Sequence, residues 1–489
     1  MHDLKNIHAA MALEFPSLAT DKSKFSSVDS RGTIKPLKIL FVVRRAEMFR
    51  FQTILQALAR CGHTVLFLFD KHWTRASDKE LLVEFGNSMQ TLVSRPAVAR
   101  HDQWRTFLFF FRELRTYRRY LIVEHQSPFY LKRWAGYLPR RLRIIVQKKF
   151  VERLLKRNIT GALFNFIERM IPPDATIVND IIAFAPDVVF ASPTTLRFSS
   201  SDLEYMKAAK ALTIPTAVLA LTWDNLTTKG LLHVIPDRLF VWNTIQKKEA
   251  EIQHNVRAKT IVITGSPTFD ALFSNIKPSV SRENFCKQYD LKSEYPFILY
   301  LGTSKNLTPD ERDLIKSLRY ALDHAEDKCM KNMQIVMRPH PANSMVYQGF
   351  EQEGIVRIPK IGETPGTSEA LQLFYDSLFY AIAAVGVNTS AMIDAIIWNK
   401  PVVAFLAPRY KETQLETQHF QQLLAYDVVE RATTPEECVE RIQVLYNGHD
   451  MRQEKRLKLV DEFIRPRGRE YEVADIIVQE IEKLAYIKD

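Results

Sequence analysis

The feature that most constrains this 489-residue chain is an alternation of short apolar runs with segments of helical periodicity. Residues 37–43 are almost wholly apolar, a helical pattern follows over residues 47–60, and a second apolar run covers residues 64–69. Strands that are apolar throughout are typical of parallel sheets covered by helices on both faces. This βαβ pattern therefore predicts an α/β protein that opens on a parallel sheet.

The alternation occurs in two series. Long helical patterns cover residues 104–120 and 140–170, after which strands and helices alternate up to residue 264. A new series starts at residue 297. Two such series predict two Rossmann-like, doubly wound domains that face each other across a cleft, with the loops after the strands at its edge.

We divide the chain on this basis. The N-terminal residues lack regularly spaced apolar side chains, which predicts a mobile tail. The C-terminal residues are amphipathic enough to return to the first domain. The predicted parts are a tail (1–36), a first Rossmann-like domain (37–275) with a helical insertion (about 100–170), a linker (276–295), a second Rossmann-like domain (296–465) and a C-terminal returning helix (466–489).

Composition narrows the class of protein. No apolar stretch approaches the roughly 18 residues that a membrane helix needs, and no secretory signal pattern stands at the N-terminus. The four cysteines are far apart, which argues against a zinc knuckle and against a disulfide framework. We therefore expect a cytoplasmic protein, either soluble or peripheral on the inner face of the cell membrane.

One segment carries the whole excess of positive charge. Residues 100–157 hold sixteen Lys and Arg against four Asp and Glu, whereas the formal charge of the chain is +11. Apolar residues are interleaved with these charges, as in helices on anionic membrane surfaces, where each basic side chain contributes about 1 kcal/mol. A solvated helix pair over the sheet is the plainer alternative. Because no nucleic-acid motif accompanies the charge, we expect no nucleic-acid partner.

Two loops of the second domain combine small and hydroxyl residues with a predicted helix start. Such loops offer backbone N–H groups and hydroxyls to an anion, and the helix dipole adds its positive end. A plain helix cap is the alternative for each loop. The residues are Gly302, Thr303 and Ser304 in the first loop and Asn388, Thr389 and Ser390 in the second.

A third strand of this domain ends in the sequence Arg-Pro-His-Pro. Two prolines fix the backbone and leave the guanidinium of Arg338 and the imidazole of His340 at the sheet edge, a geometry suited to a diphosphate. A rigid turn is the alternative. Asp394 follows Ser390 by one helical turn and would accept hydrogen bonds from a ribose or sugar hydroxyl, or stabilise its own helix.

Two acidic residues of the first domain are candidates for a general base. Asp224 follows an apolar strand, and an acid near a dry cleft can have its pKa raised toward the working range. Glu47, just after the first strand beside Arg44 and Arg45, is the alternative base. An Asx turn at Asp224 and a helix cap at Glu47 are the structural alternatives.

The order of these segments resembles the GT-B superfamily, in particular the bacterial surface-polysaccharide branch that includes capsule Kdo-transferases and CDP-glycerol glycerophosphotransferases. No single segment is diagnostic, but together they span most of residues 37–465. The segments are Gly-Ser-Pro-Thr-Phe-Asp at 265–270, Leu-Tyr-Leu-Gly-Thr-Ser at 299–304, Arg-Pro-His-Pro at 338–341, Val-Asn-Thr-Ser-Ala-Met-Ile-Asp-Ala at 387–395 and Asn-Lys-Pro-Val-Val at 399–403.

The resemblance implies a division of labour between the domains. The donor nucleotide would bind the second domain, at the positions that match the family motifs, while the acceptor and base would come from the first. Such enzymes generally need no bound metal, so the resemblance implies none here and no cofactor. The chain departs from the family pattern at Asp394, where glutamate is more usual, and in its basic insertion. The matching positions are Arg338, His340, Asn388, Thr389, Ser390 and Asp394.

Together these features predict an inverting, metal-independent glycosyltransferase of surface-polysaccharide or glycolipid synthesis. Its partners would be a nucleotide-sugar donor and a glycan or lipid-linked acceptor, with Arg338 and His340 stabilising the leaving phosphate. Three alternatives stay open: a CDP-glycerol-type polyol-phosphate transferase, a UDP-sugar 2-epimerase that needs no acceptor, and a membrane-associated scaffold without catalysis.

Overall fold

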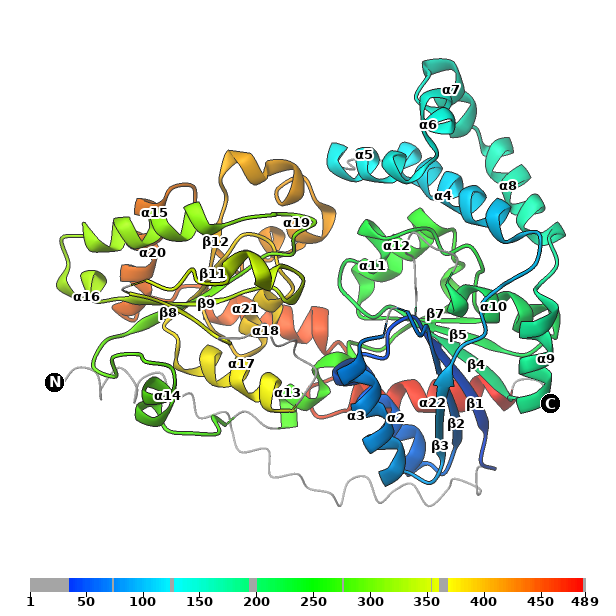
Figure 1. Cartoon of the computed structure of the whole chain (residues 1–489), viewed down its shortest axis with the longest axis horizontal. Coiled ribbons are helices and arrows are strands. Elements are labelled where there is room, and N and C mark those ends of the chain that lie inside the picture. Colours follow the sequence, from blue (N-terminus) through cyan, green and yellow to red (C-terminus); the bar gives the residue numbers. More distant parts are fainter. Residues whose placement is uncertain are drawn as a thin grey trace.

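The protein has two α/β halves, which lie side by side in Figure 1. The computed structural model describes residues 35–72, 74–123, 127–192, 200–274, 277–352, 354–359 and 368–486. Each half contains one parallel sheet, so the predicted α/β class with two Rossmann-like domains is confirmed. The tail predicted over residues 1–36 lies outside the described residues except at 35 and 36.

The first sheet has seven parallel strands in the order β3-β2-β1-β4-β5-β6-β7. Side chains that alternate along β1 enter two separate cores, with Phe41 on one face and Val42 on the other. Because both faces are covered, the strand is apolar throughout. The strands are β1 (Lys38–Val43), β2 (Thr64–Phe69), β3 (Leu92–Pro96), β4 (Val188–Ala191), β5 (Thr216–Leu219), β6 (Arg238–Val241) and β7 (Ile261–Ile263).

Helices cover both faces of this sheet. One core contains side chains of α2 (Met48–Arg60), α3 (Ala76–Ser88) and the C-terminal α22 (Val473–Tyr486). The other contains side chains of α9, α10 and α12, while the short α11 follows β5. Their bounds are α9 (Ala175–Phe184), α10 (Ser201–Ala211), α11 (Asn225–Thr228) and α12 (Thr244–His254).

The basic insertion projects from the first half as a group of five helices (Figure 1). The prediction of a single helix over residues 140–170 is wrong. The backbone is extended at Lys148 and at Arg157, and the segment therefore forms three helices. These breaks let the chain turn back, so that Val146 and Leu155 reach a small core around Trp134. The helices are α4 (Arg105–Ile122), α5 (Pro128–Tyr137), α6 (Arg140–Val146), α7 (Lys149–Lys156) and α8 (Asn158–Met170).

The second sheet has six parallel strands in the order β10-β9-β8-β11-β12-β13. In both sheets the order reverses beside the first strand, between β1 and β4 and between β8 and β11. Ligands bind outside the carboxyl ends of the strands at such switch points. The strands are β8 (Phe297–Leu301), β9 (Gln334–Arg338), β10 (Ile355–Arg357), β11 (Ala384–Gly386), β12 (Val402–Phe405) and β13 (Glu430–Ala432).

Helices also surround the second sheet. The segment predicted as linker contains α14, so it is partly helical. None of the helices in the described part of the chain is long and apolar enough to cross a membrane. The helices that follow η2 (Ala258–Thr260), η3 (Pro267–Phe269) and α13 (Asp270–Ser274) of the first half are α14 (Arg282–Gln288), α15 (Arg312–Asp323), α16 (Lys328–Lys331), α17 (Ser368–Tyr380), α18 (Ala391–Ile397), α19 (Gln418–Ala425), α20 (Pro435–Tyr446) and α21 (Gln453–Leu459), with short helical turns at η4 (Pro341–Tyr347), η5 (Pro408–Thr413) and η6 (Val460–Ile464).

The C-terminal helix α22 crosses from the second half and packs against α2 of the first. Asp270 anchors the crossing, since its carboxylate accepts hydrogen bonds from the first backbone N–H groups of α22 and pairs with Arg465 at 2.6 Å. Gly265 lies beside this crossing with φ of 93°, and a Cβ there would stand 2.6 Å from the carbonyl oxygen of Ile464. Only glycine fits such a position.

Candidate functional site

A cleft of about 460 Å³ lies between the two halves, at the carboxyl ends of their strands. The first half contributes the loops after β1 and β5, and the second half contributes the loops after β8, β9 and β11. Both switch points therefore open onto one cavity, as the sequence predicted for the loops of two facing Rossmann-like domains. The cavity is large enough for a nucleotide-sized ligand.

Arg338 stands at the end of β9 and lines the cleft. Its guanidinium lies over the ring of Phe374 in α17, with 4.5 Å between the Arg338 Cζ and the ring centroid. One of its terminal nitrogens, Nη2, donates to the carbonyl of Ala370 at 3.4 Å. Stacking on an aromatic ring holds the guanidinium plane in one orientation, which suits recognition of a phosphate group.

His340 lines the cleft two residues further on. Its Nδ1 accepts a hydrogen bond from the backbone N–H of Ala342 at 3.1 Å and thereby caps η4. Burial, and then the positive charge of Arg50, lower the pKa of His340 to about 4. The ring is therefore neutral near pH 7, and because Nδ1 accepts, its proton is on Nε2. In that state His340 donates a hydrogen bond and cannot act as a base through Nδ1.

The loop after β8 contributes one of its three predicted residues to the cleft. Gly302 lines the cavity, and its N–H donates to the carbonyl of Arg338 at 2.9 Å. Thr303 is buried and donates through its hydroxyl to Glu311 at 3.1 Å and through its N–H at 2.7 Å. Ser304 is half-buried and does not line the cavity. Thr303 thus supports the loop rather than facing the ligand space.

The loop after β11 contributes two of its three predicted residues. Thr389 and Ser390 line the cleft immediately before α18. Asn388 is buried instead, and its amide donates to the carbonyl of Thr413 in η5 at 2.7 Å. Asn388 therefore ties two loops of the second half together, and the hydroxyl residues after it are the ones that meet the cavity.

Asp394 lies in the wall of the cleft on α18. Burial raises the pKa of its carboxyl to about 7, although the positive charges of Arg50 and Arg338 act in the opposite direction. Near neutral pH the group is therefore divided between its protonated and ionised forms. Such a group can accept a proton or a hydroxyl hydrogen bond.

Glu47 stands directly before α2 and also lines the cleft. Its carboxylate pairs with the Arg50 Nε at 2.7 Å and with Arg45 at 3.8 Å. Burial alone would raise the pKa of Glu47, but the charges of Arg50 and Arg45 outweigh it and lower the pKa. Glu47 therefore remains ionised and held by arginine, which weakens it as a base.

Asp224 does not line the cleft, although its neighbours Thr222 and Trp223 do. Its carboxylate accepts hydrogen bonds from the hydroxyls of Thr222 at 2.7 Å and Thr228 at 2.6 Å, and Lys229 is 3.4 Å away. Burial would raise the pKa, but Lys229, His419 and these hydroxyls outweigh it, so the pKa is lowered. The raised pKa expected from the sequence is therefore wrong, since the loop surrounds this acid with donors.

Several cleft residues were not anticipated. Arg75 lies just before α3, a helix that the sequence pattern did not reveal. Phe374 and Tyr375 belong to α17, a helix that the sequence patterns above did not identify. Arg50 is one helical turn after Glu47. This spacing within a predicted helix was the one sequence signal that could have placed Arg50 beside Glu47 in the cleft.

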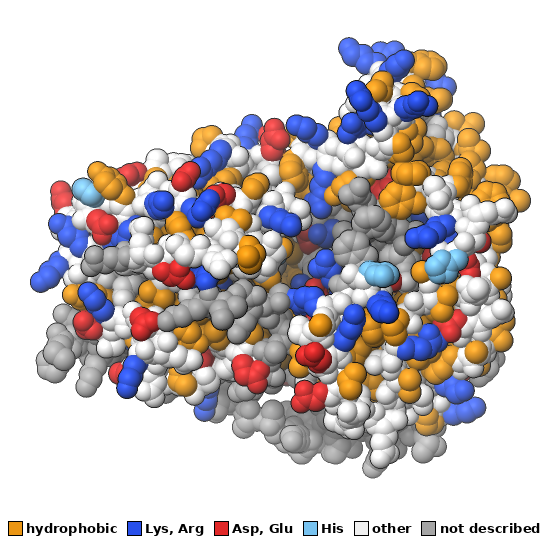
Figure 2. All heavy atoms as spheres, viewed as in Figure 1, with side chains coloured by type: hydrophobic (Ala, Val, Ile, Leu, Met, Phe, Trp, Pro, Cys, Tyr) orange, Lys and Arg blue, Asp and Glu red, His pale blue; other side chains and the backbone are white. Residues whose placement is uncertain are grey.

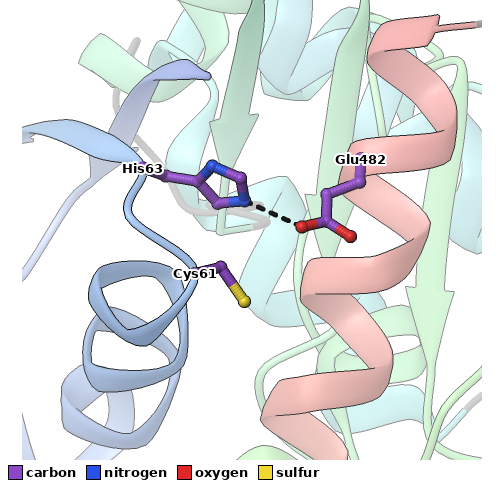
Figure 3. A group of neighbouring side chains, drawn as sticks. All are labelled: Cys61, His63 and Glu482. Carbon is purple, nitrogen blue, oxygen red and sulfur yellow. Dashed lines mark hydrogen bonds and ion pairs between the residues drawn. The ribbon is translucent and has the colours of Figure 1, made fainter. Parts of the chain in front are cut away.

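Cys61, His63 and Glu482 are the one group of Cys, His and acidic side chains among the described residues that lie close enough for a metal ion (Figure 3). The N–H of Leu37 donates to His63 Nδ1 at 3.2 Å, so the ring proton is on Nε2, 3.0 Å from Glu482. A metal ion bound to Nε2 would require the ring proton to move to Nδ1. That position already accepts the hydrogen bond from the N–H of Leu37, so the two hydrogens would collide. The group instead links the start of β2 to α22, outside the cleft.

Two Rossmann-like halves with a cleft between their switch points define the GT-B class of proteins, so the predicted fold is confirmed. A sequence model of the CDP-glycerol:poly(glycerophosphate) glycerophosphotransferase family matches residues 233–482, just over half of the chain. The chain belongs to this family, and it is a transferase with a glycosyltransferase-like GT-B fold. A search of curated protein sequences finds no match.

Solved structures of other GT-B-like proteins are similar to the whole chain. The UDP-GlcNAc 2-epimerase from Neisseria meningitidis has a TM-score of 0.53 at 13% identity, with 91% of this chain and 100% of that chain covered. A glycosyltransferase from Rickettsia africae has a TM-score of 0.51 at 10% identity, with 93% and 100% covered. The UDP-N-acetylglucosamine 2-epimerase from Rickettsia bellii has 0.52 at 12%, with 93% and 98% covered. At these identities the likeness establishes the fold.

Proposed function

We propose that this protein transfers a polyol phosphate group from a CDP-linked donor to a hydroxyl acceptor. The family to which the chain belongs supports the CDP-linked donor. The observation that carries the choice of reaction is the charge of the cleft, which is lined by four arginines and two carboxylates. The arginines are Arg45, Arg50, Arg75 and Arg338, and the carboxylates are Glu47 and Asp394.

This charge balance suits phosphoryl transfer better than sugar transfer. A phosphoryl-transfer transition state spreads negative charge over the oxygens of the transferred group, and arginines stabilise it. The transition state of glycosyl transfer has oxocarbenium character, so its developing positive charge is repelled by nearby guanidinium groups. Three of the arginines belong to the first half, opposite the predicted nucleotide loops. They therefore face the side where the transferred group would lie.

The acceptor oxygen attacks the β-phosphorus of the donor, a new P–O bond forms, and the P–O bond to the bridging oxygen breaks, so that CMP leaves. Arg338 and the Nε2–H of His340 offset the charge on the departing phosphate. The acceptor proton passes to a carboxylate, and Asp394 fits this role because burial raises its pKa to about 7.

Metal independence is part of the proposal. The cleft arginines supply positive charge that a divalent cation supplies in other phosphoryl-transfer enzymes. We therefore expect turnover to persist after dialysis against a chelator. A rate that depends on added Mg²⁺ or Mn²⁺ would contradict this part of the proposal without affecting the choice of donor.

Sugar transfer from a nucleotide-sugar is the second candidate. A glycosyltransferase is among the similar structures, and the Neisseria meningitidis epimerase is bound to UDP-GlcNAc. Under this candidate the same second-half loops would hold the nucleotide, and the acceptor hydroxyl would attack the anomeric carbon. An epimerase would instead convert UDP-GlcNAc with no acceptor present. The identity of the donor and the need for an acceptor together separate the three reactions.

The first test is a thermal-unfolding screen against CMP, CDP, CDP-glycerol, UDP, UDP-GlcNAc and GDP. A ligand present at 100 times its dissociation constant adds about 2.7 kcal/mol of stability to the folded state. We expect CMP, CDP and CDP-glycerol to raise the Tm and the uridine and guanosine compounds to leave it unchanged. Arg338→Ala should remove the response, whereas Arg441→Ala, an exposed arginine on α20, should retain it.

Each other outcome selects a different reaction. Stabilisation by UDP-GlcNAc alone, followed by its epimerisation without an acceptor, would identify an epimerase. Stabilisation by nucleotide-sugars without epimerisation would favour sugar transfer. If no nucleotide changed the Tm of the wild-type protein, the chain would be better described as a scaffold. CMP release that requires both CDP-glycerol and an acceptor would establish the proposed reaction.

We also propose that the insertion places the protein on an anionic membrane surface. Basic and apolar side chains lie together on this projection at the top right of Figure 2. Apolar side chains of α7 and α8 face outward, and Phe150 and Ile159 are 76% and 73% exposed. An amphipathic surface of this kind inserts its apolar side chains at the level of the lipid headgroups, with Lys and Arg around them.

Vesicle flotation tests this placement. The wild-type protein should float with vesicles of phosphatidylcholine and phosphatidylglycerol and remain free of vesicles of phosphatidylcholine alone. Phe150→Glu should lower the bound fraction, by roughly tenfold in partition coefficient, because a buried phenylalanine contributes about 1.5–3 kcal/mol. Met451→Glu replaces an equally exposed side chain of the second half and should have no effect. Equal binding by both variants would exclude this face.

A further inference from the structure

A second pocket of about 320 Å³ lies between the insertion and the first sheet domain, bordered by α4, α8 and α12. Three arginines of α4 line it: Arg115, Arg118 and Arg119. Arg118 and Arg119 follow Arg115 by three and four positions, so all three side chains share one face of the helix. None of the residues that line this pocket also lines the cleft.

The pocket has an excess of positive charge. Among the described residues that line it there is no carboxylate. The nearest acid in contact is Glu168, which pairs with Arg115 at 3.1 Å but also with Arg112 at 2.7 Å and with Lys207 at 3.0 Å. Glu168 is therefore shared by three cations beside the pocket, of which Arg112 also pairs with Glu204. Arg118 and Arg119 donate to neutral acceptors among the described residues, including the carbonyls of Leu155 and Leu226.

Burial acts on all three guanidinium groups in the same direction. Burial lowers the pKa of Arg115 to about 10, with Glu168 acting against it, and also lowers the pKa of Arg118 and Arg119. A cation whose pKa falls on burial lacks enough compensating negative charge. An anion in the pocket would supply it.

The positions of two side chains indicate that the pocket is built for a ligand. Arg118 donates from Nε and Nη2 to the carbonyls of Leu155 and Arg157, which fixes its plane, and Nη1 makes no hydrogen bond to the described residues. Gly161 makes room for it, since a Cβ there would stand 2.7 Å from Arg118 Nη2. Arg119 is 4% exposed, and its Nε is buried without a partner in the described part of the chain.

We propose that this pocket binds the phosphate group of a phosphate ester. A tetrahedral phosphate presents several oxygens, which several guanidinium groups of one helix face can engage at once. The cavity is larger than inorganic phosphate, and apolar side chains stand at its edge, including Ile252 of α12, which is 73% exposed. These dimensions suit an ester with an organic portion beyond the phosphate. Either a soluble ester or the headgroup of an anionic lipid offers that chemistry.

A ligand in this pocket would stand close to contacts between the two halves. Gln253 lines the pocket, and its amide donates to Gln418 of the second half at 2.8 Å. Arg119 also donates to carbonyls of the loop that follows β5, at Leu226 and Lys229. The pocket therefore lies behind the loop whose Trp223 lines the cleft, but its residues are separate from those of the cleft.

Isothermal titration calorimetry of the full-length protein with inorganic phosphate and glycerol 3-phosphate tests the proposal. We expect two classes of site, of which Arg338→Ala removes the one in the cleft and Arg118→Ala removes the other. Loss of a charge-assisted hydrogen bond should weaken binding by roughly tenfold or more. Arg153→Ala removes the same charge from an exposed position of α7 and should leave both classes intact.

Gly161→Ala supplies a variant without any change of charge. Its methyl group would displace the Arg118 guanidinium, whereas alanine favours the helix more than glycine does. We expect it to weaken the Arg118-dependent site and to keep or raise the Tm, which separates ligand loss from misfolding. The proposal is independent of the donor chemistry, since Arg338→Ala should retain this site.

Vesicle binding distinguishes a lipid headgroup from a soluble ester as the ligand of this pocket. If the ligand is a lipid headgroup, glycerol 3-phosphate should bind weakly, while vesicles containing phosphatidylglycerol should bind in a manner that Arg118→Ala weakens. Arg441→Ala, which removes an exposed arginine of α20 outside the insertion, should leave vesicle binding unchanged. If the ligand is soluble, Arg118→Ala should change the titration with glycerol 3-phosphate and leave vesicle binding unchanged. Equal effects of Arg118→Ala and its control variant in both assays, or no effect of Arg118→Ala in either assay, would overturn the proposal.

Discussion

Arg50 connects the electrostatics of the two halves at the level of single residues. Its guanidinium pairs with Glu47 of its own half. Its charge also lowers the pKa of His340 and opposes the raised pKa of Asp394, both in the second half. The protonation states in the cleft therefore depend on how closely the halves approach, since Coulomb interactions fall with distance. A change in the distance between the halves would therefore shift the pKa of Asp394 through Arg50.

The first prediction concerns Asp394 as the proton acceptor. Because burial raises its pKa to about 7, the ionised form that accepts a proton is lost as the pH falls below 7. We expect kcat/KM for CMP release from CDP-glycerol to rise with pH and to level off above about 7. Asp394→Asn should lower kcat by about 10²–10⁴-fold and flatten this profile.

Glu47→Gln serves as the comparison for that prediction. Its carboxylate is already ionised and held by Arg50, so its removal should leave the inflection near pH 7 in place. His340 should add no inflection between pH 5 and 8, because its pKa is about 4. An unchanged profile in Asp394→Asn would assign the proton acceptor to another residue.

The sequence located the cleft residues that belong to short local patterns. Arg338 and His340 could be predicted because a strand followed by Arg-Pro-His-Pro must present both at the sheet edge. The environment of a side chain could not be predicted in this way. The lowered pKa of Asp224 depends on Lys229 within its loop and on His419 from the other half, and the burial of Asn388 depends on its bond to Thr413. Such neighbours are set by tertiary packing.

At the scale of elements, the loops after β8 and β9 act as one unit. Gly302 packs directly on the backbone of the second loop, and a Cβ there would stand 3.0 Å from the N of His340 and 3.1 Å from the carbonyl oxygen of Arg338. The close contact holds Arg338 and His340 at the cleft. Any side chain at position 302 must push the two loops apart, because backbone atoms cannot rotate away.

Gly302→Ala should therefore disturb both stability and binding. We expect a loss of about 1–3 kcal/mol in the free energy of unfolding, as for other overpacked sites, and weaker binding of CMP. Gly136→Ala is the matched control, because Gly136 lies in α5 with no atom within 4 Å of a new Cβ, and alanine there should stabilise by about 0.5–1 kcal/mol. Denaturant unfolding and CMP titration measure both quantities. Normal CMP binding by Gly302→Ala would show that the loops tolerate separation.

Long apolar strands were the elements that the sequence predicted best. Residues 64–69 form β2 with the predicted bounds, and β8 begins at residue 297, where the second series was predicted to start, because full burial on both faces leaves an unbroken apolar run. The edge strands β3, β10 and β13 were missed, since an edge strand is short and partly exposed and lacks this signal. The insertion was predicted as helical but not as five helices, because breaks at ordinary residues such as Gln147 carry no Gly or Pro signal.

At the scale of the whole molecule, hydrogen bonds join the halves through residues that do not line the cleft. Ser127 of the insertion donates to the carbonyl of Glu412 in η5 at 2.5 Å, so the insertion reaches the second half as well as covering the first. Gln422 of α19 donates to the Glu249 carboxyl of α12 at 2.7 Å. These contacts join α5 and α12 to η5 and α19, and so they limit how far the halves can separate.

Glu249 makes this interface sensitive to pH. Burial raises its pKa to about 8 from an ordinary value of 4.5, with the negative charge of Asp224 adding to the effect. A carboxyl whose pKa is raised by folding is protonated in the folded state while it is ionised in the unfolded state. The folded state then binds more protons over the range from about pH 4.5 to 8, so the free energy of unfolding must fall as the pH rises through that range.

Glu249→Gln should remove this dependence, because glutamine keeps the shape and hydrogen-bonding capacity of the protonated acid and does not titrate. We expect the variant to be more stable than the wild type at pH 8 by on the order of a few kcal/mol, since each pKa unit corresponds to about 1.4 kcal/mol. The difference should shrink as the pH falls and vanish only well below pH 4.5, where the wild-type residue is protonated in both states. Urea unfolding from pH 5 to 8 measures it, with Glu251→Gln on the same helix as the control. Parallel curves for Glu249→Gln and the wild type would mean that water reaches this acid and that the halves separate in solution.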